Sequence, residues 1–406
     1  GQLYAYEQQV SQVTPVVDSV ESTTWSVLPY FKNGDLIVNA SPNNGGNYIA
    51  WRYTPVSNTI NITMKGVVIN APGGTSSGIN IFSANVGEHG NVWNSGFWRL
   101  EITFVYSGGK NYVGWKNESS AYLDVVANNV PNFNYNYPFT FTVILTENSA
   151  GNVTVACVYV NGTKYVLDDN TGYPWNEIGY IGFKAGDSDV FNVSYFAVSP
   201  APYGGVEVFV NNVESTGWKV FPYWDNGDLV LNQTSSPNYA QYIEWKYTPI
   251  SNVINVTMHV TSYSNNTNVA DTGVLISTPN TGYYSSTTSS SSISYFLLID
   301  FNRVYVWYYM PGGGFVKLYS QLPIANTNYP FTFTVILTEN ATGYVTISSI
   351  YINSTAYQIG FNTPLKWDEI GYIGIYEDAH IFYYVTYFSI SQTLDVYSLV
   401  TNPYTN

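Results

Sequence analysis

Residues 134–148, NYNYPFTFTVILTEN, recur almost unchanged as residues 326–340, NTNYPFTFTVILTEN. From Phe139 to Leu145, every second residue is a large apolar one, and the residues between are mostly threonine. This period-two alternation is typical of a strand that packs one face against a core. The stretch therefore predicts a β-strand that occurs once in each half of the chain.

Three further blocks repeat in the same order. Residues 20–39 match 213–232 at 13 of 20 positions, 48–64 match 242–258, and 175–183 match 367–375, always at an offset of 192 to 194. Four collinear blocks indicate two homologous units of about 190 residues, an ordinary domain size. We predict an N-terminal tail at 1–12, domain 1 at 13–199, a short Pro/Gly linker at 200–205, domain 2 at 206–391 and a C-terminal tail at 392–406.

Hairpin signals punctuate both units. Asn161-Gly162 lies between two alternating runs, and Asn33-Gly34 and Asn226-Gly227 hold equivalent places in the repeat. Such pairs supply the positive φ angles of a tight two-residue turn. We find no long, capped stretch with 3.6-residue periodicity. The sequence predicts an all-β protein: two tandem homologous antiparallel β-sandwich (jelly-roll) domains with extra terminal tail strands.

The composition limits the function classes. The 406 residues include 39 Tyr, 20 Phe and 11 Trp, enough rings for a large core, but only 10% charged residues, with a net charge of −14. This field repels phosphate backbones and anionic lipids, so nucleic acid is not an expected partner. No uninterrupted apolar stretch predicts a membrane span. The start at Gly1 suggests a processed secretory protein or a missing leader, and we expect an extracellular or cell-surface location, in an acidic or otherwise harsh setting because few ion pairs are available to lose.

No catalytic residues emerge. Glu177 and Glu369 sit at equivalent positions beside Trp175 and Trp367, which could suggest an acid near a sugar-stacking ring. We expect instead that these tryptophans are buried and that the glutamates support the turn. The paired carboxylates of a glycosidase strand do not occur. We therefore predict that the protein is not an enzyme.

Metal and cofactor sites also lack their parts. His89, His259 and His380 are isolated, and the single cysteine, Cys157, lies in an apolar run that predicts a small buried residue. Calcium is conceivable at three aspartates, Asp35, Asp187 and Asp228, but the alternating carboxylates of a calcium loop are missing. We expect no metal and no cofactor apart from N-linked glycans.

Four segments follow one another in each domain. In domain 1 they are FTFTVILTE, the VYVNGT hairpin, EIGYIGF and VFNVSYFAV, which domain 2 repeats as FTFTVILTE, IYINST, EIGYIGI and IFYYVTYFSI. This order resembles the carboxyl-terminal half of concanavalin A-like or laminin-G-like jelly rolls. The resemblance covers about 60 residues of each domain and is a pattern of hydrophobic and glycine positions. It implies the fold and no activity.

Both tails alternate like strands, and the layout resembles the donor-strand surface filaments of archaea, whose thread or pilus-like subunits insert a processed N-terminal tail into a neighbour. The resemblance implies a structural subunit that polymerises head to tail with itself. Here two jelly rolls stand where simpler subunits have one. The predicted donor-strand residues are Leu3, Tyr4, Ala5, Tyr6, Val10 and Val13.

Other interpretations remain open. Either tail could be the donor, or both tails could fold back on their own domains. The protein could instead be a secreted carbohydrate-binding adhesin or surface-layer protein, binding surface glycans through exposed rings such as Trp93, Trp98, Trp115 and Trp307. A glycoside hydrolase is the least supported alternative.

Asparagine sequons suggest a heavily glycosylated surface. The eleven acceptors are Asn39, Asn61, Asn117, Asn152, Asn161, Asn192, Asn232, Asn255, Asn265, Asn340 and Asn353. We expect mass spectrometry of protein from its native host to find glycans on several of them. Eleven unmodified asparagines would contradict this.

Overall fold

The computed structural model describes most of the chain. The described residues are 3–22, 25–40, 47–71, 76–83, 99–106, 112–116, 123–126, 136–186, 188–200, 207–214, 218–232, 241–265, 271–278, 294–300, 305–310, 314–320, 330–377 and 381–401. Nearly every element is a strand, and every strand pairing is antiparallel. The predicted β-sandwich, jelly-roll class is confirmed.

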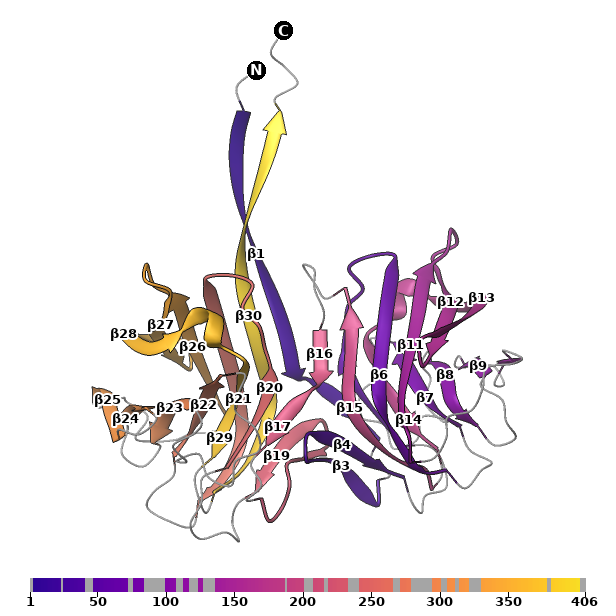
Figure 1. The fold of residues 1–406 in the computed structure, drawn as a ribbon, viewed down its shortest axis with the longest axis horizontal. Coiled ribbons are helices and arrows are strands. Elements are labelled where there is room, and N and C mark those ends of the chain that lie inside the picture. The colour runs from indigo at the N-terminus through magenta and orange to yellow at the C-terminus, as the bar shows by residue number, and fades with distance from the viewer. Residues whose placement is uncertain are drawn as a thin grey trace.

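One large sheet runs through the molecule (Figure 1). Its order is β13 (Thr163–Pro174), β12 (Asn152–Val160), β11 (Pro138–Glu147), β6 (Thr59–Asn70), β15 (Val190–Ser199), β4 (Asp35–Asn39), β3 (Val27–Lys32), β18 (Tyr223–Asp225), β19 (Asp228–Asn232), β30 (Ile381–Thr401), β21 (Val253–Asn265), β26 (Phe331–Glu339), β27 (Tyr344–Ile352) and β28 (Thr355–Lys366). Two more strands join from the side: β1 (Leu3–Val17) pairs with β30, and β16 (Glu207–Val210) pairs with β15.

Each half adds one seven-stranded sheet. The first has the order β10 (Leu123–Val126), β9 (Tyr112–Lys116), β8 (Arg99–Tyr106), β7 (Ser76–Phe82), β14 (Tyr180–Ala185), β5 (Asn47–Arg52) and β2 (Ser19–Glu21). The second has the order β17 (Asn212–Glu214), β20 (Gln241–Lys246), β29 (Tyr372–Glu377), β22 (Asp271–Ser277), β23 (Ser294–Asp300), β24 (Tyr305–Met310) and β25 (Gly314–Ser320). Two 3-10 turns, η1 (Trp175–Glu177) and η2 (Trp367–Glu369), precede β14 and β29.

The large sheet has the same strand order when it is followed from either end. We call residues 13–199 unit 1 and residues 206–391 unit 2. The strands from β13 to β3 in unit 1 correspond by sequence to those from β28 to β18 in unit 2. The halves meet where Tyr30 of β3 pairs with Tyr223 of β18, beside a 2.8 Å hydrogen bond from the Phe31 backbone N–H to the Pro222 carbonyl. The two predicted sandwich units share one continuous sheet.

A single hydrophobic core spans both units, and aromatic rings cross the seam. Trp51 of unit 1 lies edge-on to Trp224 of unit 2, with centroids 6.2 Å apart. Phe31 and Trp245 make the corresponding contact at 6.4 Å. All four side chains are at most 1% exposed, so separating the units would expose a large apolar area.

Buried carboxylates close hairpin turns across the same seam. Glu214, 1% exposed, accepts hydrogen bonds from the Gly34 backbone N–H at 3.2 and 3.1 Å, and Glu21 accepts one from the Asn226 N–H at 2.7 Å. Each glutamate thus accepts a backbone hydrogen bond from a hairpin turn of the other unit. The Asn-Gly pairs have the positive φ values predicted for them, for example +55° at Asn33 and +81° at Gly34. At Gly227, φ is +84° and an added Cβ would lie 2.7 Å from the Ser19 carbonyl oxygen.

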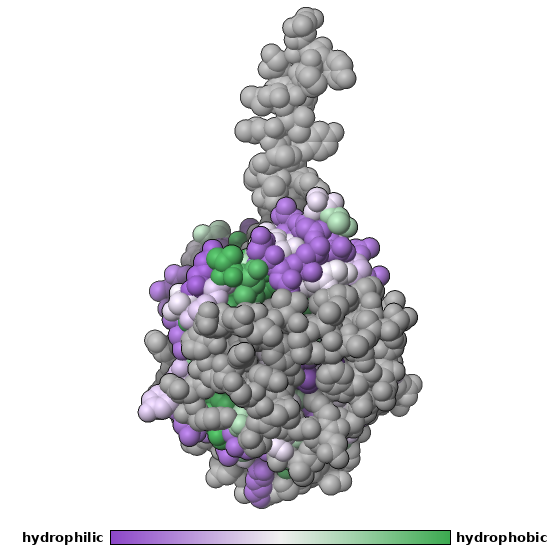
Figure 2. All heavy atoms as spheres, turned by 90° about the vertical axis from the view of Figure 1, so that its right-hand side faces the viewer, coloured by the Kyte–Doolittle hydropathy of each residue, from purple (hydrophilic) through white to green (hydrophobic). Residues whose placement is uncertain are grey.

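The outward faces of the large sheet are mostly polar. The strand β26 buries Phe331, Phe333, Val335 and Leu337 and turns its threonines outward. On the side of the molecule shown in Figure 2, hydrophilic residues surround smaller hydrophobic groups. Exposed apolar residues recur at equivalent loop positions, with Val56 47% and Ile250 53% exposed. A surface built from hydroxyls and amides matches the low charged fraction of the sequence.

The shared turns predict coupled unfolding. Replacing Glu214 by Ala removes the acceptor of the Gly34 N–H and leaves this partly buried donor without its carboxylate, so we expect a loss of about 1–3 kcal/mol in the free energy of unfolding. The whole molecule should lose this stability in one transition, followed by circular dichroism and tryptophan fluorescence in urea. The exposed Glu147→Ala variant is the control. Two transitions, of which only one moves, would contradict the shared core.

Candidate functional site

The terminal strands complete the sheet by crossing between units. The strand β16, which leads into unit 2, pairs with β15, the last strand of unit 1, with Val210 opposite Phe196. The strand β1, which leads into unit 1, pairs with β30, the last strand of unit 2, with Val17 opposite Phe388. These positions correspond in the repeat, so each unit receives the leading strand of the other. We call the two places beside β15 and β30 the exchange sites.

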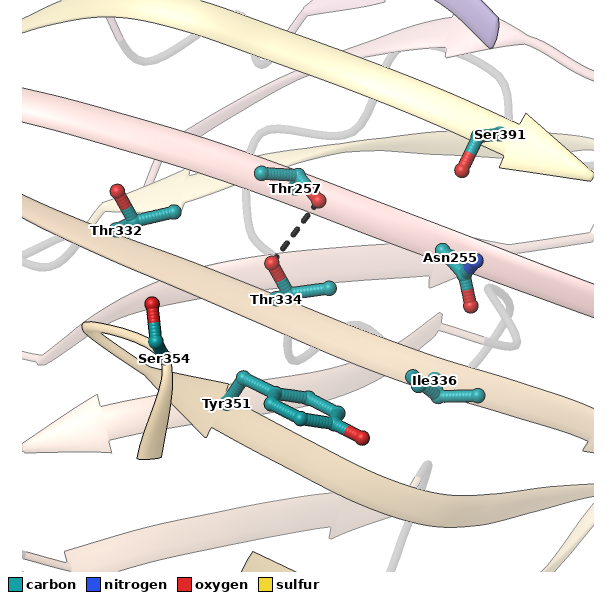
Figure 3. A pocket seen from close by; sticks show the side chains of 8 residues that line it. All are labelled: Asn255, Thr257, Thr332, Thr334, Ile336, Tyr351, Ser354 and Ser391. Atoms are coloured by element: carbon teal, nitrogen blue, oxygen red, sulfur yellow. Dashed lines mark hydrogen bonds between the residues drawn. The ribbon is translucent and has the colours of Figure 1, made fainter. Parts of the chain in front are cut away.

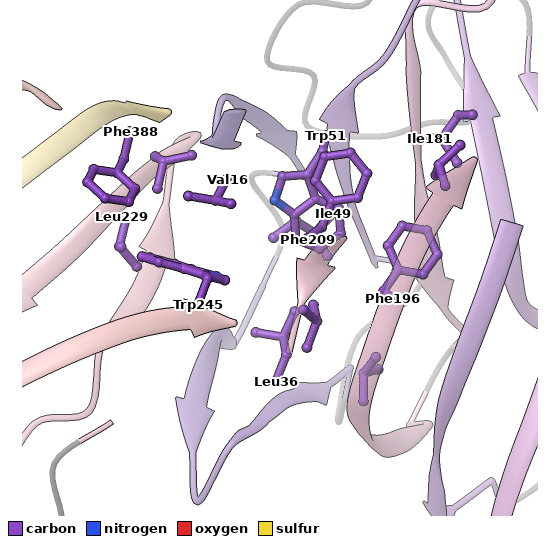
Figure 4. Close-up of a cluster of buried hydrophobic side chains, with 14 of the residues drawn as sticks. Val16, Leu36, Ile49, Trp51, Ile181, Phe196, Phe209, Leu229, Trp245 and Phe388 are labelled. Atoms are coloured by element: carbon purple, nitrogen blue, oxygen red, sulfur yellow. The ribbon is translucent and has the colours of Figure 1, made fainter. Parts of the chain in front are cut away.

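Both exchange sites are filled by buried apolar side chains (Figure 4). Phe209 of β16 is fully buried and stacks on Trp51, with ring centroids 5.2 Å apart and planes 20° apart. In the other site Val16 is 2% exposed, and Trp245 packs against Phe388 at 5.5 Å. Burying an aromatic or branched side chain contributes roughly 1.5–3 kcal/mol, so an empty exchange site would destabilise the fold.

Beyond its exchange site, β1 continues to pair with β30. The register runs from Val13 opposite Ser391 to Leu3 opposite Thr401. The paired strands rise from the body as a two-stranded ribbon, so that the two ends of the chain lie side by side (Figure 1). We call residues 3–13 and 391–401 the terminal ribbon.

The predicted donor-strand residues therefore all lie on β1, but opposite the C-terminal tail of the same chain. Leu3, Tyr4, Ala5, Tyr6, Val10 and Val13 lie opposite Thr401, Val400, Leu399, Ser398, Leu394 and Ser391. The boundary that we placed after residue 12 falls inside one continuous strand. Pairing with a neighbouring molecule remains a prediction.

The two exchange sites differ where the chain leaves the body. In unit 1, β15 ends at Ser199 and the Tyr53 hydroxyl donates to the Pro200 carbonyl at 2.8 Å. In unit 2, the strand continues, and the Gln392 side-chain oxygen accepts from the backbone N–H groups of Ile250 and Ser251 at 2.7 and 3.0 Å. Gln392 thus attaches the base of the ribbon to the loop that contains Ile250 and Ser251. Residues 201–206, which include most of the predicted linker, lie outside the described residues.

Ionisable side chains are buried at and near the first exchange site. Glu207 of β16 is 2% exposed, and burial raises the pKa of its carboxyl to about 8. Burial, and next the nearby Glu207, hold the pKa of the Tyr53 hydroxyl above its ordinary value. Burial also raises the pKa of Glu214 to about 7, although backbone donors of Asn33 and Gly34 oppose the shift. These carboxyls favour the protonated, uncharged form in the folded state.

The sequons occupy different kinds of position. Asn161 and Asn353 are exposed in hairpin turns. Asn61, Asn192 and Asn255 lie within strands. Asn39, Asn152, Asn232, Asn265 and Asn340 lie at or just beyond strand ends, and Asn117 lies outside the described residues. Glycosylation at these sites remains a prediction.

The residues considered for catalysis are dispersed. Trp175 and Trp367 are each 6% exposed, as predicted, and the Trp367 indole donates to the Ser251 carbonyl at 3.0 Å. The Glu369 carboxylate makes a 3.7 Å ion pair with Lys366. The carbonyl of Glu177 accepts from the Tyr173 hydroxyl. Their geometry supplies no pair of carboxylates facing a shared cleft, and the absence of enzymatic activity remains a prediction.

The possible metal ligands and the candidate sugar-stacking tryptophans form no site among the described residues. In the described part of the chain, no three His, Cys, Asp or Glu side chains gather as they would around a metal ion. Cys157 is 5% exposed, which confirms its predicted burial. The His259 Nδ1 atom forms a 2.5 Å hydrogen bond with the Thr386 hydroxyl. His89, His380, Asp187, Trp93 and Trp98 lie outside the described residues, and the side chains of Trp115 and Trp307 are not described.

Comparison with known proteins gives one clear sequence relative. The chain is 49% identical over 399 residues to the "Putative transmembrane protein ORF1334" of Acidianus two-tailed virus. The match covers 97% of this chain and 29% of that protein, so the chain spans less than a third of its relative. No family model matches. Among the described residues, none of the helices has the length and apolar character that a bilayer crossing requires.

Similar solved structures are remote. One is the VIP36 exoplasmic/lumenal domain, with a TM-score of 0.32 and 12% identity over 50% of this chain and 90% of that one. Another is the Emp46p carbohydrate recognition domain, with a TM-score of 0.30 and 11% identity over 46% of this chain and 87% of that one. The alginate lyase Aly36B is similar at a TM-score of 0.29, with 11% identity over 44% of this chain and 94% of that one. Similarity at this level says nothing about activity.

The buried Glu207 predicts that stability falls as pH rises. Between the ordinary carboxyl pKa near 4.5 and the folded value of about 8, the folded state holds a proton that the unfolded state has lost, so the free energy of unfolding decreases with pH over that window. We expect Glu207→Gln to match the wild type near pH 4 and to be about 2–4 kcal/mol more stable near pH 8. Urea unfolding at both pH values measures this, with exposed Glu147→Gln as control. A constant difference at all pH values would contradict it.

Proposed function

We propose that the protein is a non-enzymatic structural subunit of an extracellular filament or surface assembly, in which copies join through the exchange site beside β30. The observation that carries this proposal is the unequal attachment of the two leading strands. The strand β16 is only a few residues from β15 along the chain, whereas β1 and β30 are separated by nearly the whole chain. No short connector holds β1 against its own β30.

The same contacts can therefore form between copies. If the part of β1 in the terminal ribbon pairs with β30 of the next molecule, the register from Leu3–Thr401 to Val13–Ser391 is unchanged. Exchange of an identical element is a low-cost route to association. When the exchange is not reciprocal, each copy gives a strand and receives one, and a head-to-tail fibre results.

The sequence relative is consistent with this role. A viral protein that carries a related segment over 29% of its length, and is named a putative transmembrane protein, could display such a module on a virion or cell surface. The surface rich in hydroxyls and amides, and carboxyls that prefer their protonated form, suit an acidic extracellular medium.

Cross-linking between copies tests the exchange. Val10 lies opposite Leu394, so cysteines at these positions should form a disulfide across the pair. We expect co-refolded Val10→Cys and Leu394→Cys chains to form mixed disulfide dimers, visible on a non-reducing gel. Leu399→Cys, which lies opposite Ala5, is the out-of-register partner and should not link to Val10→Cys.

Two results would overturn the proposal. If only the doubly substituted chain forms the bond, and does so as a monomer, the strand stays within its own molecule. Deleting residues 1–12 keeps Val16 and Val17 in the core and should leave folded monomers that no longer assemble. Continued polymerisation of that variant would exclude residues 1–12 as the joining element.

A further inference from the structure

The outward face of unit 2 contains an open pocket of about 440 Å³, within the roughly 300–1,000 Å³ of small-molecule sites (Figure 3). Its lining residues come from four neighbouring strands and one hairpin turn. They are Asn255, Thr257, Thr332, Thr334, Ile336, Tyr351, Ser354 and Ser391. We call this site the hydroxyl pocket.

The lining selects a class of ligand. Six hydroxyl groups and one amide offer both donors and acceptors, and no charged side chain lines the pocket. The Tyr351 ring and the Ile336 side chain add apolar surface. A molecule with many hydroxyls, a C–H face and no charge matches this lining, whereas a phosphate, sulfate or carboxylate would find no cation.

One buried polar atom lacks a partner in the pocket. The Asn255 side-chain oxygen is shielded from solvent and makes no hydrogen bond with the protein. Unpaired buried acceptors of this kind are rare and cost free energy, so the Asn255 amide is an incompletely satisfied group beside the pocket. By contrast, Thr257 and Thr334 bond each other at 3.0 Å across β21 and β26, which fixes their orientation.

The pocket is built on a rigid surface. Asn255 lies opposite Ile336 on β26 and opposite Ser391 on β30, and Thr334 lies opposite Tyr351 on β27. At the rim, the Asn353 side chain accepts from the Thr332 backbone N–H at 2.8 Å and closes the turn that carries Ser354. Groups held on hydrogen-bonded strands need little reordering when a ligand binds.

We propose that the hydroxyl pocket binds an uncharged sugar residue, with the Asn255 amide nitrogen and the threonine hydroxyls bonding its hydroxyls and Tyr351 covering its C–H face. This site adjoins the exchanged strand, because Ser391 of its lining pairs with Val13 of β1, and it differs from the tryptophans considered for an adhesin. It uses the sequon asparagine Asn255 as a binding group, so that residue carries no glycan of its own.

Unit 1 supplies a matched control. The positions equivalent to the lining hold the same residue types, except that Gly162 replaces Ser354. They are Asn61, Thr63, Thr140, Thr142, Ile144, Tyr159 and Ser199. Thr63 and Thr142 also bond each other at 3.0 Å. Variants there change similar chemistry on an equivalent strand framework without touching the pocket of unit 2.

Titration calorimetry with the full, unglycosylated chain tests the site. The probes are methyl glycosides of glucose, mannose and galactose, followed by an array of neutral, sulfated and uronic oligosaccharides. We expect a neutral sugar to bind, with at least a roughly tenfold loss of affinity in Tyr351→Ala and in Thr334→Val. Tyr159→Ala and Thr142→Val in unit 1 should leave the affinity for the unit 2 site unchanged. The Thr334→Val change preserves shape and strand preference, so it guards against loss by unfolding.

Each other outcome overturns the proposal. These outcomes are no binding of any neutral probe at millimolar concentration, preference for charged oligosaccharides, affinity that is unchanged in the unit 2 variants, or loss confined to the unit 1 variants. A glycan found on Asn255 of the native protein would also overturn it, because that glycan would fill the pocket.

Discussion

The structure depends on the pairing of each unit's last strand with a strand that belongs to the other unit. At one exchange site Phe209 stacks on Trp51, and at the other Val16 and Trp245 are both buried in the shared core. Without these leading strands, buried apolar side chains at both sites would lose their cover. The continuous sheet, the ring contacts across the seam and the reciprocal turns join the same two units.

Buried carboxylates show how the arrangement is fixed. Glu214 and Glu21 each bond backbone groups of the opposite unit, and an apolar residue could not satisfy those donors. Burial raises the pKa of Glu214 to about 7 and that of Glu207 to about 8, so the cost of keeping them charged depends on pH. The stability of these contacts between the units is therefore expected to fall as the pH rises.

The local structure followed from the sequence, and the assembly of the halves did not. The alternation in residues 139–145 and the Asn-Gly pairs predicted the strands and turns, because burial and positive φ leave local marks. Nothing local marks Val17 as the partner of Phe388, since pairing over such a distance depends on which edges remain open. The hydroxyl pocket was missed for a similar reason: Asn255, Thr334 and Tyr351 are far apart in sequence and look like ordinary outward-facing strand residues.

The reciprocal pairing has the form of an ancestral homodimer fused into one chain. A single unit of this kind could not cover its own tryptophan, so it would have needed a second copy at sufficient concentration. Joining two copies through about six residues, 200–205, replaces that bimolecular encounter with a tethered one, for which the effective concentration is on the order of millimolar. Once fused, the two halves could diverge in their loops while remaining mutually dependent for folding.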